Sequence, residues 1–263
     1  MSIEYIKVGK CIWCQNEKPL VGFKNQPHTI SKQIGGSFIG FDICDTCNRY
    51  FGTNDNPSKY SMSVELAFKE IFNVTRYLMP DPSENKKIKP ERLASVYFEY
   101  YKSKRIFRIK KRFELTRNFL TDFTRQFKKG VYEVFLQEYH RNTEQGLDAK
   151  FDKIRDFARY DKGDLPLYFA DNNGVYLIPE DFSIPSLAFN ENNLSTINDF
   201  GFYSIWLFGH ILYIEVTPRA ELTREIYLNS EVKKIVGSGF INKSIKEMRL
   251  ITDLDFTLYR LRK

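Results

Sequence analysis

The sequence lacks any uninterrupted apolar run of the roughly 18 residues that a membrane-spanning helix needs. Its first ten residues, MSIEYIKVGK, lack the apolar region of a secretory signal peptide. It also lacks a Walker phosphate loop, a dinucleotide-binding glycine fingerprint, a serine-centred nucleophile elbow and internal repeats. We therefore expect a cytoplasmic protein without a membrane partner, outside those nucleotide-binding, hydrolase and repeat classes.

The composition is that of an ordinary globular chain. With 263 residues and 42% hydrophobic content, it can bury a sizeable core, and we expect one small and one larger domain. The formal net charge of +7 and the pI of about 9.0 favour a polyanionic partner.

Cysteine is scarce, and its placement is informative. The chain has four cysteines, arranged as two Cys-x-x-Cys pairs: Cys11 with Cys14, and Cys44 with Cys47. Two thiolates at this spacing reach one metal ion from a tight turn, so two such knuckles predict a tetrahedral Cys₄ site suited to structural Zn²⁺. The alternatives are two disulfides, which rarely persist in a reducing cytosol, or four unrelated buried thiols.

The residues between and after the knuckles form a further pattern. FKNQPHTI at 23–30 is followed by Gly35-Gly36, and the second knuckle ends in Cys47-Asn48. In this order the features resemble the zinc-stapled branch of the HNH endonuclease family, over about a sixth of the chain. The resemblance implies a ββα-metal fold at the N-terminus and metal-dependent cleavage of phosphodiester bonds.

The resemblance also implies roles for two residues. His28 would be the general base that activates water, and Asn48 would be a ligand of a catalytic Mg²⁺ or Mn²⁺. A neutral imidazole suits that role, since its ordinary pKa lies near 6.5. The alternatives are that His28 is a structural hydrogen-bonding residue and that Asn48 caps a helix.

The chain departs from the family pattern at two positions. Pro27 stands where the family has an acidic residue, and Gly52 stands one helical turn after Asn48, where many members have another ligand. Mg²⁺ prefers carboxylate oxygens. Either a nearby group substitutes, the ion binds weakly, or the nuclease is inactive. The nearby carboxylates that the sequence offers are Asp42, Asp45 and Asp55.

We predict an α+β chain in three segments. Residues 1–58 form the zinc-bound HNH-like unit, residues 59–160 form a basic helical region, and residues 161–263 form a mixed β-hairpin and helix domain packed with it. Helical periodicity and caps predict helices at 63–78, 91–100, 116–144, 151–160, 221–235 and 243–250. Short apolar runs predict strands at 165–170, 175–178, 202–208, 211–216 and 256–261.

Three local features carry further expectations. Gly130, inside the 116–144 helix, indicates a bend or a close contact. His140 lies near the polar end of that helix and receives no role. His210 is expected at an exposed hairpin tip, in a Gly209-His210 loop of type II′, and is not assigned to catalysis.

Basic residues are concentrated in one region. Residues 86–129 contain fifteen Lys or Arg against four Asp or Glu, a net charge of +11 that exceeds the charge of the whole chain. Clustered cations grip the phosphates of nucleic acid, whereas a solvated face is the simpler explanation. The candidate phosphate contacts are Lys102, Lys104, Arg105, Arg108, Lys110, Lys111 and Arg112.

These observations favour a metal-dependent HNH endonuclease that acts on double-stranded DNA. The family implies roles in restriction, phage defence or mobile-element homing, with a regulatory protein or a second copy of the chain as a further partner. One alternative is a catalytically degenerate HNH module that binds DNA or docks a protein. Another is a structural zinc domain attached to an unrelated enzyme.

Overall fold

The computed structural model describes residues 3–53, 62–78, 95–96, 98–101, 106–110, 116–171, 185–237 and 244–254. These residues form an α+β structure with a four-stranded antiparallel sheet. The elements, in chain order, are η1 (Lys32–Ile34), α1 (Asp45–Gly52), α2 (Val64–Leu78), β1 (Phe98–Tyr101), β2 (Ile106–Ile109), α3 (Arg117–Thr143), η2 (Ala149–Phe151), α4 (Asp152–Ala158), β3 (Leu167–Asp171), α5 (Glu191–Phe200), β4 (Phe202–Leu207), β5 (His210–Glu215), α6 (Ala220–Gly237), β6 (Ser244–Glu247) and α7 (Ile251–Leu254).

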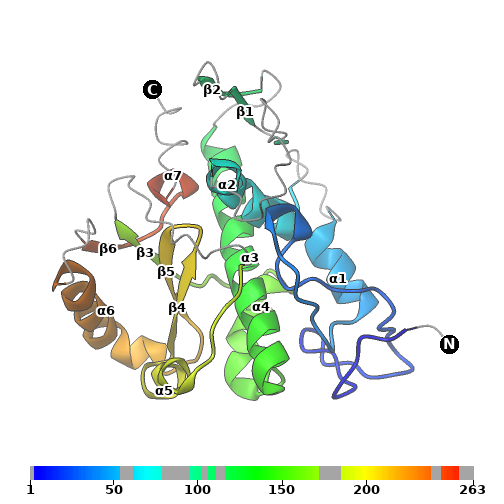
Figure 1. Cartoon of the computed structure of the whole chain (residues 1–263). Coiled ribbons are helices and arrows are strands. Elements are labelled where there is room, and N and C mark those ends of the chain that lie inside the picture. The colour runs from blue at the N-terminus through cyan, green and yellow to red at the C-terminus, as the bar shows by residue number, and fades with distance from the viewer. Residues whose placement is uncertain are drawn as a thin grey trace, which may run out of the picture.

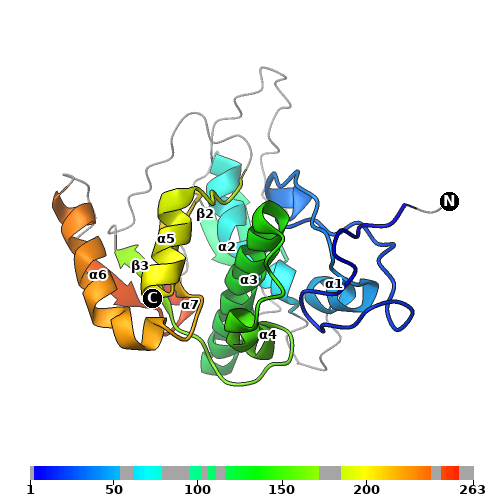
Figure 2. The same ribbon diagram turned by 90° about the horizontal axis from the view of Figure 1, so that it is seen from below.

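Helix α3 is the central element of the molecule. Its 27 residues span about 40 Å at 1.5 Å per residue. The cysteine-containing segment and α2 lie on one side, and the sheet with α5 and α6 lies on the other (Figure 1). In the view from below, α1 and the helices α5 and α6 again lie on opposite sides of α3 (Figure 2). Thr116 caps the helix by accepting a hydrogen bond from the N–H of Phe119, and Glu144 ends it in a left-handed conformation.

Because α3 is covered from two sides, it is buried around most of its circumference. The apolar repeat predicted the stripe that faces the core, but it did not predict the burial of polar residues such as Lys129, Glu133 and Glu138. The expectation that His140 lies at a polar end is wrong, since its side chain is only 1% exposed. These buried polar groups therefore need partners within the protein.

The sheet has the order β4-β5-β3-β6. The β4–β5 hairpin was predicted, but its loop is Phe208-Gly209, one residue earlier than expected. Both loop residues have positive φ, 48° and 77°, as in a type I′ turn. His210 instead pairs with Leu207 as the first residue of β5 and is 4% exposed, so the predicted exposed tip is wrong. Burial lowers the pKa of His210 to about 4.

Two expected helices are wrong, and one helix was not predicted. Residues 98–100, expected to end a helix, belong to β1, which pairs with β2. Residues 244–247 form edge strand β6 against β3 instead of a helix. A short segment can be compatible with the periodicity of a helix and with that of a strand. In both segments, pairing with another strand produced a strand. Helix α5 was missed, and the predicted strands at 175–178 and 256–261 lie outside the described residues.

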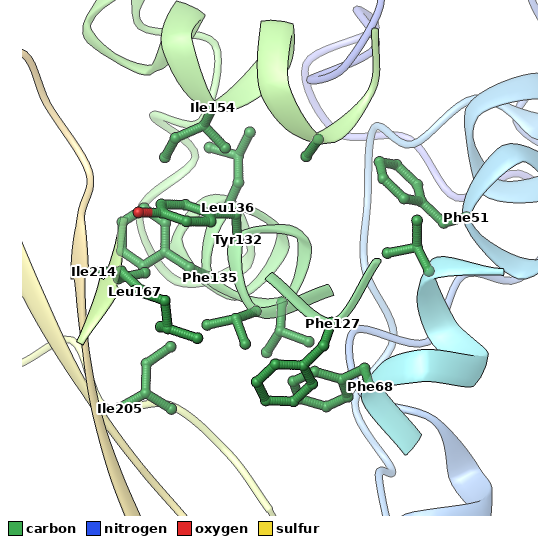
Figure 3. Packing of buried hydrophobic residues seen from close by; sticks show 14 of the residues in the cluster. Phe51, Phe68, Phe127, Tyr132, Phe135, Leu136, Ile154, Leu167, Ile205 and Ile214 are labelled. Carbon is green, nitrogen blue, oxygen red and sulfur yellow. The ribbon is translucent and has the colours of Figure 1, made fainter. Parts of the chain in front are cut away.

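One hydrophobic core cluster extends from Cys11 to Leu254, so all three predicted segments contribute to it. Figure 3 shows Tyr132 and Phe135 of α3 near Leu167, Ile205 and Ile214 of the sheet. Where α2 packs on α3, the rings of Phe68 and Phe127 stack with centroids 6.1 Å apart.

The close contact expected at Gly130 is confirmed. A Cβ atom at this position would lie 2.8 Å from Cβ of Phe68 and 3.3 Å from the carbonyl oxygen of Val64. Glycine therefore allows α2 and α3 to approach closely, and this approach helps to set the position of the pocket described below.

Candidate functional site

The four cysteines converge and are positioned to hold a metal ion. Their Sγ atoms all lie within 4.8 Å of one another, and Sγ of Cys14 is 3.7 Å from Sγ of Cys44. Tetrahedral Zn–S bonds of about 2.3 Å imply sulfur separations of about 3.8 Å, so the arrangement is consistent with structural zinc. All four cysteines are free of disulfides, which excludes the disulfide alternative in this structure.

Local backbone geometry builds both knuckles. In the first, the N–H of Gln15 donates to the carbonyl oxygen of Cys11, and Gln15 adopts a φ of 59°. In the second, Sγ of Cys44 accepts the N–H of Cys47 at 3.4 Å and thereby caps α1. The cap of this helix is therefore Cys44 and not Asn48.

The thiols are too close together to ionise independently. The contact with Cys11, and after it the contact with Cys47, lowers the pKa of Cys44 to about 7, although the contact with Cys14 opposes this shift. Contacts with the neighbouring thiols also lower the pKa of Cys14 and raise those of Cys11 and Cys47. Four adjacent thiolates repel one another unless a cation lies between them, which is the condition that a metal-binding cage satisfies.

Two arginines of the α4 region anchor this cluster to the rest of the protein. Arg155, which is 3% exposed, donates from Nε to the carbonyl oxygen of Ile12 at 2.7 Å. Arg159 donates from Nε to Sγ of Cys47 at 3.2 Å and lies 4.3 Å from the ring centroid of Tyr50. Although burial opposes its charge, the hydrogen bond to Cys47 raises the pKa of Arg159. A cation that donates to a metal-binding sulfur stabilises its thiolate form.

His28 lies on an antiparallel hairpin between the two knuckles. His28 forms a bridge with Ile39, and the N–H of Gly40 donates to the carbonyl oxygen of Pro27 at 2.9 Å. The two arms of this hairpin form a single bridge and no regular strand, and the second knuckle and α1 follow them.

Buried polar contacts fix this hairpin against α3. The hydroxyl of Thr29 donates to Oε1 of Glu138, a carboxylate with 0% exposure. Arg141 donates to the other oxygen of Glu138 at 2.8 Å, and its guanidinium lies 4.2 Å from the ring centroid of Phe38. The residue after His28 is therefore attached directly to the central helix.

The His28 side chain lines a small pocket. The other lining residues come from the hairpin, α2 and α3: Thr29, Ile30, Ser31, Glu65, Phe68, Glu133 and Val134. Nδ1 of His28 is shielded from solvent and has no hydrogen-bond partner among the described residues. Burial, and after it the charge of Lys32, lowers the pKa of His28. The imidazole is therefore neutral near pH 7 and able to accept a proton.

Two carboxylates share this pocket, and the sequence did not point to either. Glu133 is 5% exposed, and its Oε1 accepts a hydrogen bond from Nε2 of Gln137 at 2.9 Å. Burial, reinforced by the charge of Glu65, raises the pKa of Glu133 well above its ordinary value. Burial also raises the pKa of Glu65. In the sequence, each of these glutamates is a charged residue next to the apolar stripe of its helix. A solvent-exposed helix face shows the same pattern, so the sequence did not mark either residue as part of a site.

The remaining predicted ligands do not join the pocket. Asn48 is half-buried on α1 and is not among the pocket-lining residues. Asp42 accepts the N–H groups of residues 7–9, and Asp45 accepts those of Lys24 and Asn25 at 2.9 and 2.7 Å. Both carboxylates thus hold loops in place, and Asp55 lies outside the described residues.

Most of the predicted phosphate-binding segment also lies outside the described residues. This applies to Lys102, Lys104, Arg105, Lys111 and Arg112. Of the two basic residues that are described, Arg108 is exposed and pairs with Glu99 at 3.2 Å. Lys110 donates from Nζ to the carbonyl oxygen of Ser95. The role of this segment stays a prediction.

Comparisons with protein-family models, with curated proteins and with solved structures found no match for this chain. Among the described helices, none is both long and apolar enough to cross a bilayer.

Proposed function

We propose that the protein is a metal-dependent endonuclease of the HNH type that cleaves phosphodiester bonds of nucleic acid, with duplex DNA as the preferred substrate. Structural zinc bound by the four cysteines stabilises the N-terminal unit, and Mg²⁺ or Mn²⁺ serves catalysis. The basic segment 102–112 supplies contacts to substrate phosphates.

The observation that carries this proposal is the setting of His28. Its neutral imidazole, with an unpartnered Nδ1, lies on one arm of a hairpin that precedes the second knuckle and α1. The contacts of Thr29 and Arg141 with Glu138 hold this arm in place, so the base is positioned by the fold and not by a mobile loop. A positioned neutral histidine suits proton abstraction from an attacking water.

In this mechanism, His28 takes a proton from the water that attacks the scissile phosphate. A bound divalent ion supplies charge stabilisation for the leaving oxygen. The structural and the catalytic metal have separate tasks, because a closed Cys₄ site has no open position for a substrate.

A plasmid-cleavage assay tests the proposal with Mg²⁺, with Mn²⁺ and with a chelator that spares the zinc. Cleavage by the wild-type protein should require the divalent ion. His28→Ala should lose about 10²–10⁴-fold in rate while its zinc content and DNA binding stay unchanged. Gln26→Ala, an exposed change on the same hairpin, is the matched control and should cleave like the wild type. Equal rates for His28→Ala and the wild type would exclude His28 as the base.

A second candidate function is a non-catalytic DNA-binding or docking module. It is favoured by Pro27, which offers no metal ligand, and by the position of Asn48 outside the His28 pocket. Duplex binding without cleavage, with every divalent ion tried, would support this candidate over the enzyme.

A further inference from the structure

The His28 pocket brings together acidic residues from two helices. Glu65 lies in the first turn of α2, and Glu133 lies in the middle of α3. Both line the same small pocket as His28, and the close approach of α2 and α3 at Gly130 brings the two helices together. Three ionisable groups from three separate elements therefore share one concave site.

The position of Glu65 bears on one of the missing family ligands. Gly52 ends α1 at the position where the family pattern places a further metal-binding side chain. A Cβ atom on Gly52 would lie 3.5 Å from both Oε1 and Oε2 of Glu65. The carboxylate of α2 therefore lies against the position that a side chain of residue 52 would occupy.

Among the described residues, the charge of Lys69 opposes the effect of burial on the pKa of Glu65. No ion pair among these residues involves Glu65 or Glu133, whereas other buried charges, such as Lys129 with Asp161 at 2.6 Å, are paired. The nearby Lys69 donates instead to Oε1 of Gln33 at 2.6 Å. Glu133 is buried and Glu65 is half-buried, and two neighbouring carboxylates in such a setting favour either the uptake of protons or the binding of a cation.

We infer that Glu65 and Glu133 bind the divalent cation, Mg²⁺ or Mn²⁺, that works with His28. This inference rests on the proposed nuclease function and identifies the oxygen donors that Pro27 and Gly52 fail to supply. Mg²⁺ does not need a cage built wholly from protein, because it retains several waters and is usually held by one or two carboxylates with substrate phosphates. His28 lines the same pocket as the two carboxylates, so an ion held there lies on the side of the proposed base.

The direct test measures Mn²⁺ binding to the zinc-loaded full-length protein by calorimetry or electron paramagnetic resonance. We expect the wild type to bind one Mn²⁺ in addition to its zinc. Glu65→Gln and Glu133→Gln should each weaken that binding at least about tenfold, since Mn²⁺ favours carboxylate over amide oxygen. Glu70→Gln is the matched control and should bind Mn²⁺ like the wild type. Glu70 is a buried glutamate of the same helix α2, its pKa is also raised by burial, and it lies outside the pocket.

A second measurement does not depend on how well the variants fold. The chain has only three histidines, so their imidazole protons give few and separable NMR signals. Substoichiometric Mn²⁺ should broaden the His28 signal before those of His140 and His210, which do not line the pocket. Uniform broadening, or earlier loss of either other signal, would overturn the inference.

The outcomes separate this inference from the proposed function. If the wild type binds no Mn²⁺, or if Glu65→Gln and Glu133→Gln bind it as tightly as Glu70→Gln, the inference is wrong; cleavage that still depends on His28 would leave the nuclease in place. If both variants lose Mn²⁺ but the wild type cuts neither DNA nor RNA, the cation site stands and the nuclease proposal fails.

Discussion

Nε2 of His140 lies 3.1 Å from Oδ2 of Asp42, and both side chains are almost completely buried. Nδ1 of His140 accepts the N–H of Gly146 at 3.1 Å, so the proton must be on Nε2, which donates to the carboxylate. Asp42 also accepts the N–H groups of residues 7–9. This pair therefore connects the loop before the second knuckle, the N-terminal segment and the end of α3.

Breaking this pair should destabilise the protein strongly. Asp42→Ala should lower the free energy of unfolding by about 3–5 kcal/mol, because several buried donors lose a charged acceptor. His140→Ala should cost about 1.5–3 kcal/mol, the range for one hydrogen bond to a charged group. Denaturant unfolding of both single variants and the double variant gives the coupling energy. Strict additivity would show that the two side chains do not interact.

The same pair predicts a dependence of stability on pH. Burial opposes ionisation of Asp42, but the hydrogen bonds from His140 and from the N–H groups of residues 7–9 outweigh it and lower the pKa of Asp42. A depressed folded-state pKa adds stability that is present above the ordinary pKa and is lost as the pH falls below about 4. Asp42→Asn removes this titration, so its unfolding free energy should fall less steeply than that of the wild type across this range.

Gly130→Ala should destabilise the protein, although alanine is normally the better helix former. The intrinsic gain of about 0.5–1 kcal/mol is outweighed by overpacking against Phe68 and Val64, which costs about 1–3 kcal/mol. Gly52→Ala is the control, since its Cβ would make an ordinary contact at 3.5 Å. Thermal unfolding should show a lower Tm for Gly130→Ala only, and an unchanged Tm would mean that α2 and α3 have room between them.

The sulfur contact of Arg159 predicts an effect on metal affinity. Cys44→Ser should remove metal binding and unfold the N-terminal unit, because the energy of metal binding stabilises this fold. Arg159→Ala should leave the cage intact but weaken zinc binding by about 10–100-fold, the usual effect of losing a hydrogen bond to a ligand. Competition with a chromogenic chelator measures both variants. Lys153→Ala, an exposed change on α4, should match the wild type, and equal affinity for Arg159→Ala would assign Arg159 to packing against Tyr50.

Charge reversal of three basic residues in segment 102–112 should weaken binding to all duplex sequences alike, because phosphate contacts carry no base information. Each lost phosphate contact should reduce the slope of log K against log salt by about 0.9. The control variant reverses the charge of three exposed lysines elsewhere, so that both triple variants have the same net charge. These lysines are Lys162, Lys233 and Lys234. If both triple variants bind alike, the segment is an ordinary solvated surface.

The sequence predicted those features that depend on local pattern. The two knuckles were visible as Cys-x-x-Cys spacing, and α3 was visible from its apolar repeat and its capping Thr116. The close approach at Gly130 followed from a glycine inside a helix, where the residue is otherwise unfavourable.

Features that depend on long-range contact were not predictable. Strand β6 is a strand only because it pairs with β3, about 75 residues earlier in the chain. The Glu65 and Glu133 carboxylates share a pocket only because α2 and α3 pack against each other, and neither residue belongs to a spaced motif. His210 was placed at a hairpin tip because the turn was assigned one residue too late, which shifts the partner of every β4 residue by two positions along β5.

Pro27 stands at the position where the HNH family, which the N-terminal segment resembles, has an acidic ligand. Pro27 is buried in the hairpin beside His28, so an aspartate there would be costly without a cation nearby. If the site binds a divalent ion, Pro27→Asp should lower the Mg²⁺ concentration that half-maximal cleavage requires by about tenfold, since only ~1.4 kcal/mol of added binding is needed. Mg²⁺ should also raise the Tm of Pro27→Asp more than that of the wild type. Pro27→Asn, similar in size but uncharged, separates the carboxylate from the loss of proline. If the wild type and Pro27→Asp both leave DNA and RNA uncut with every divalent ion, the chain is not a nuclease, and a DNA-binding module becomes its best description.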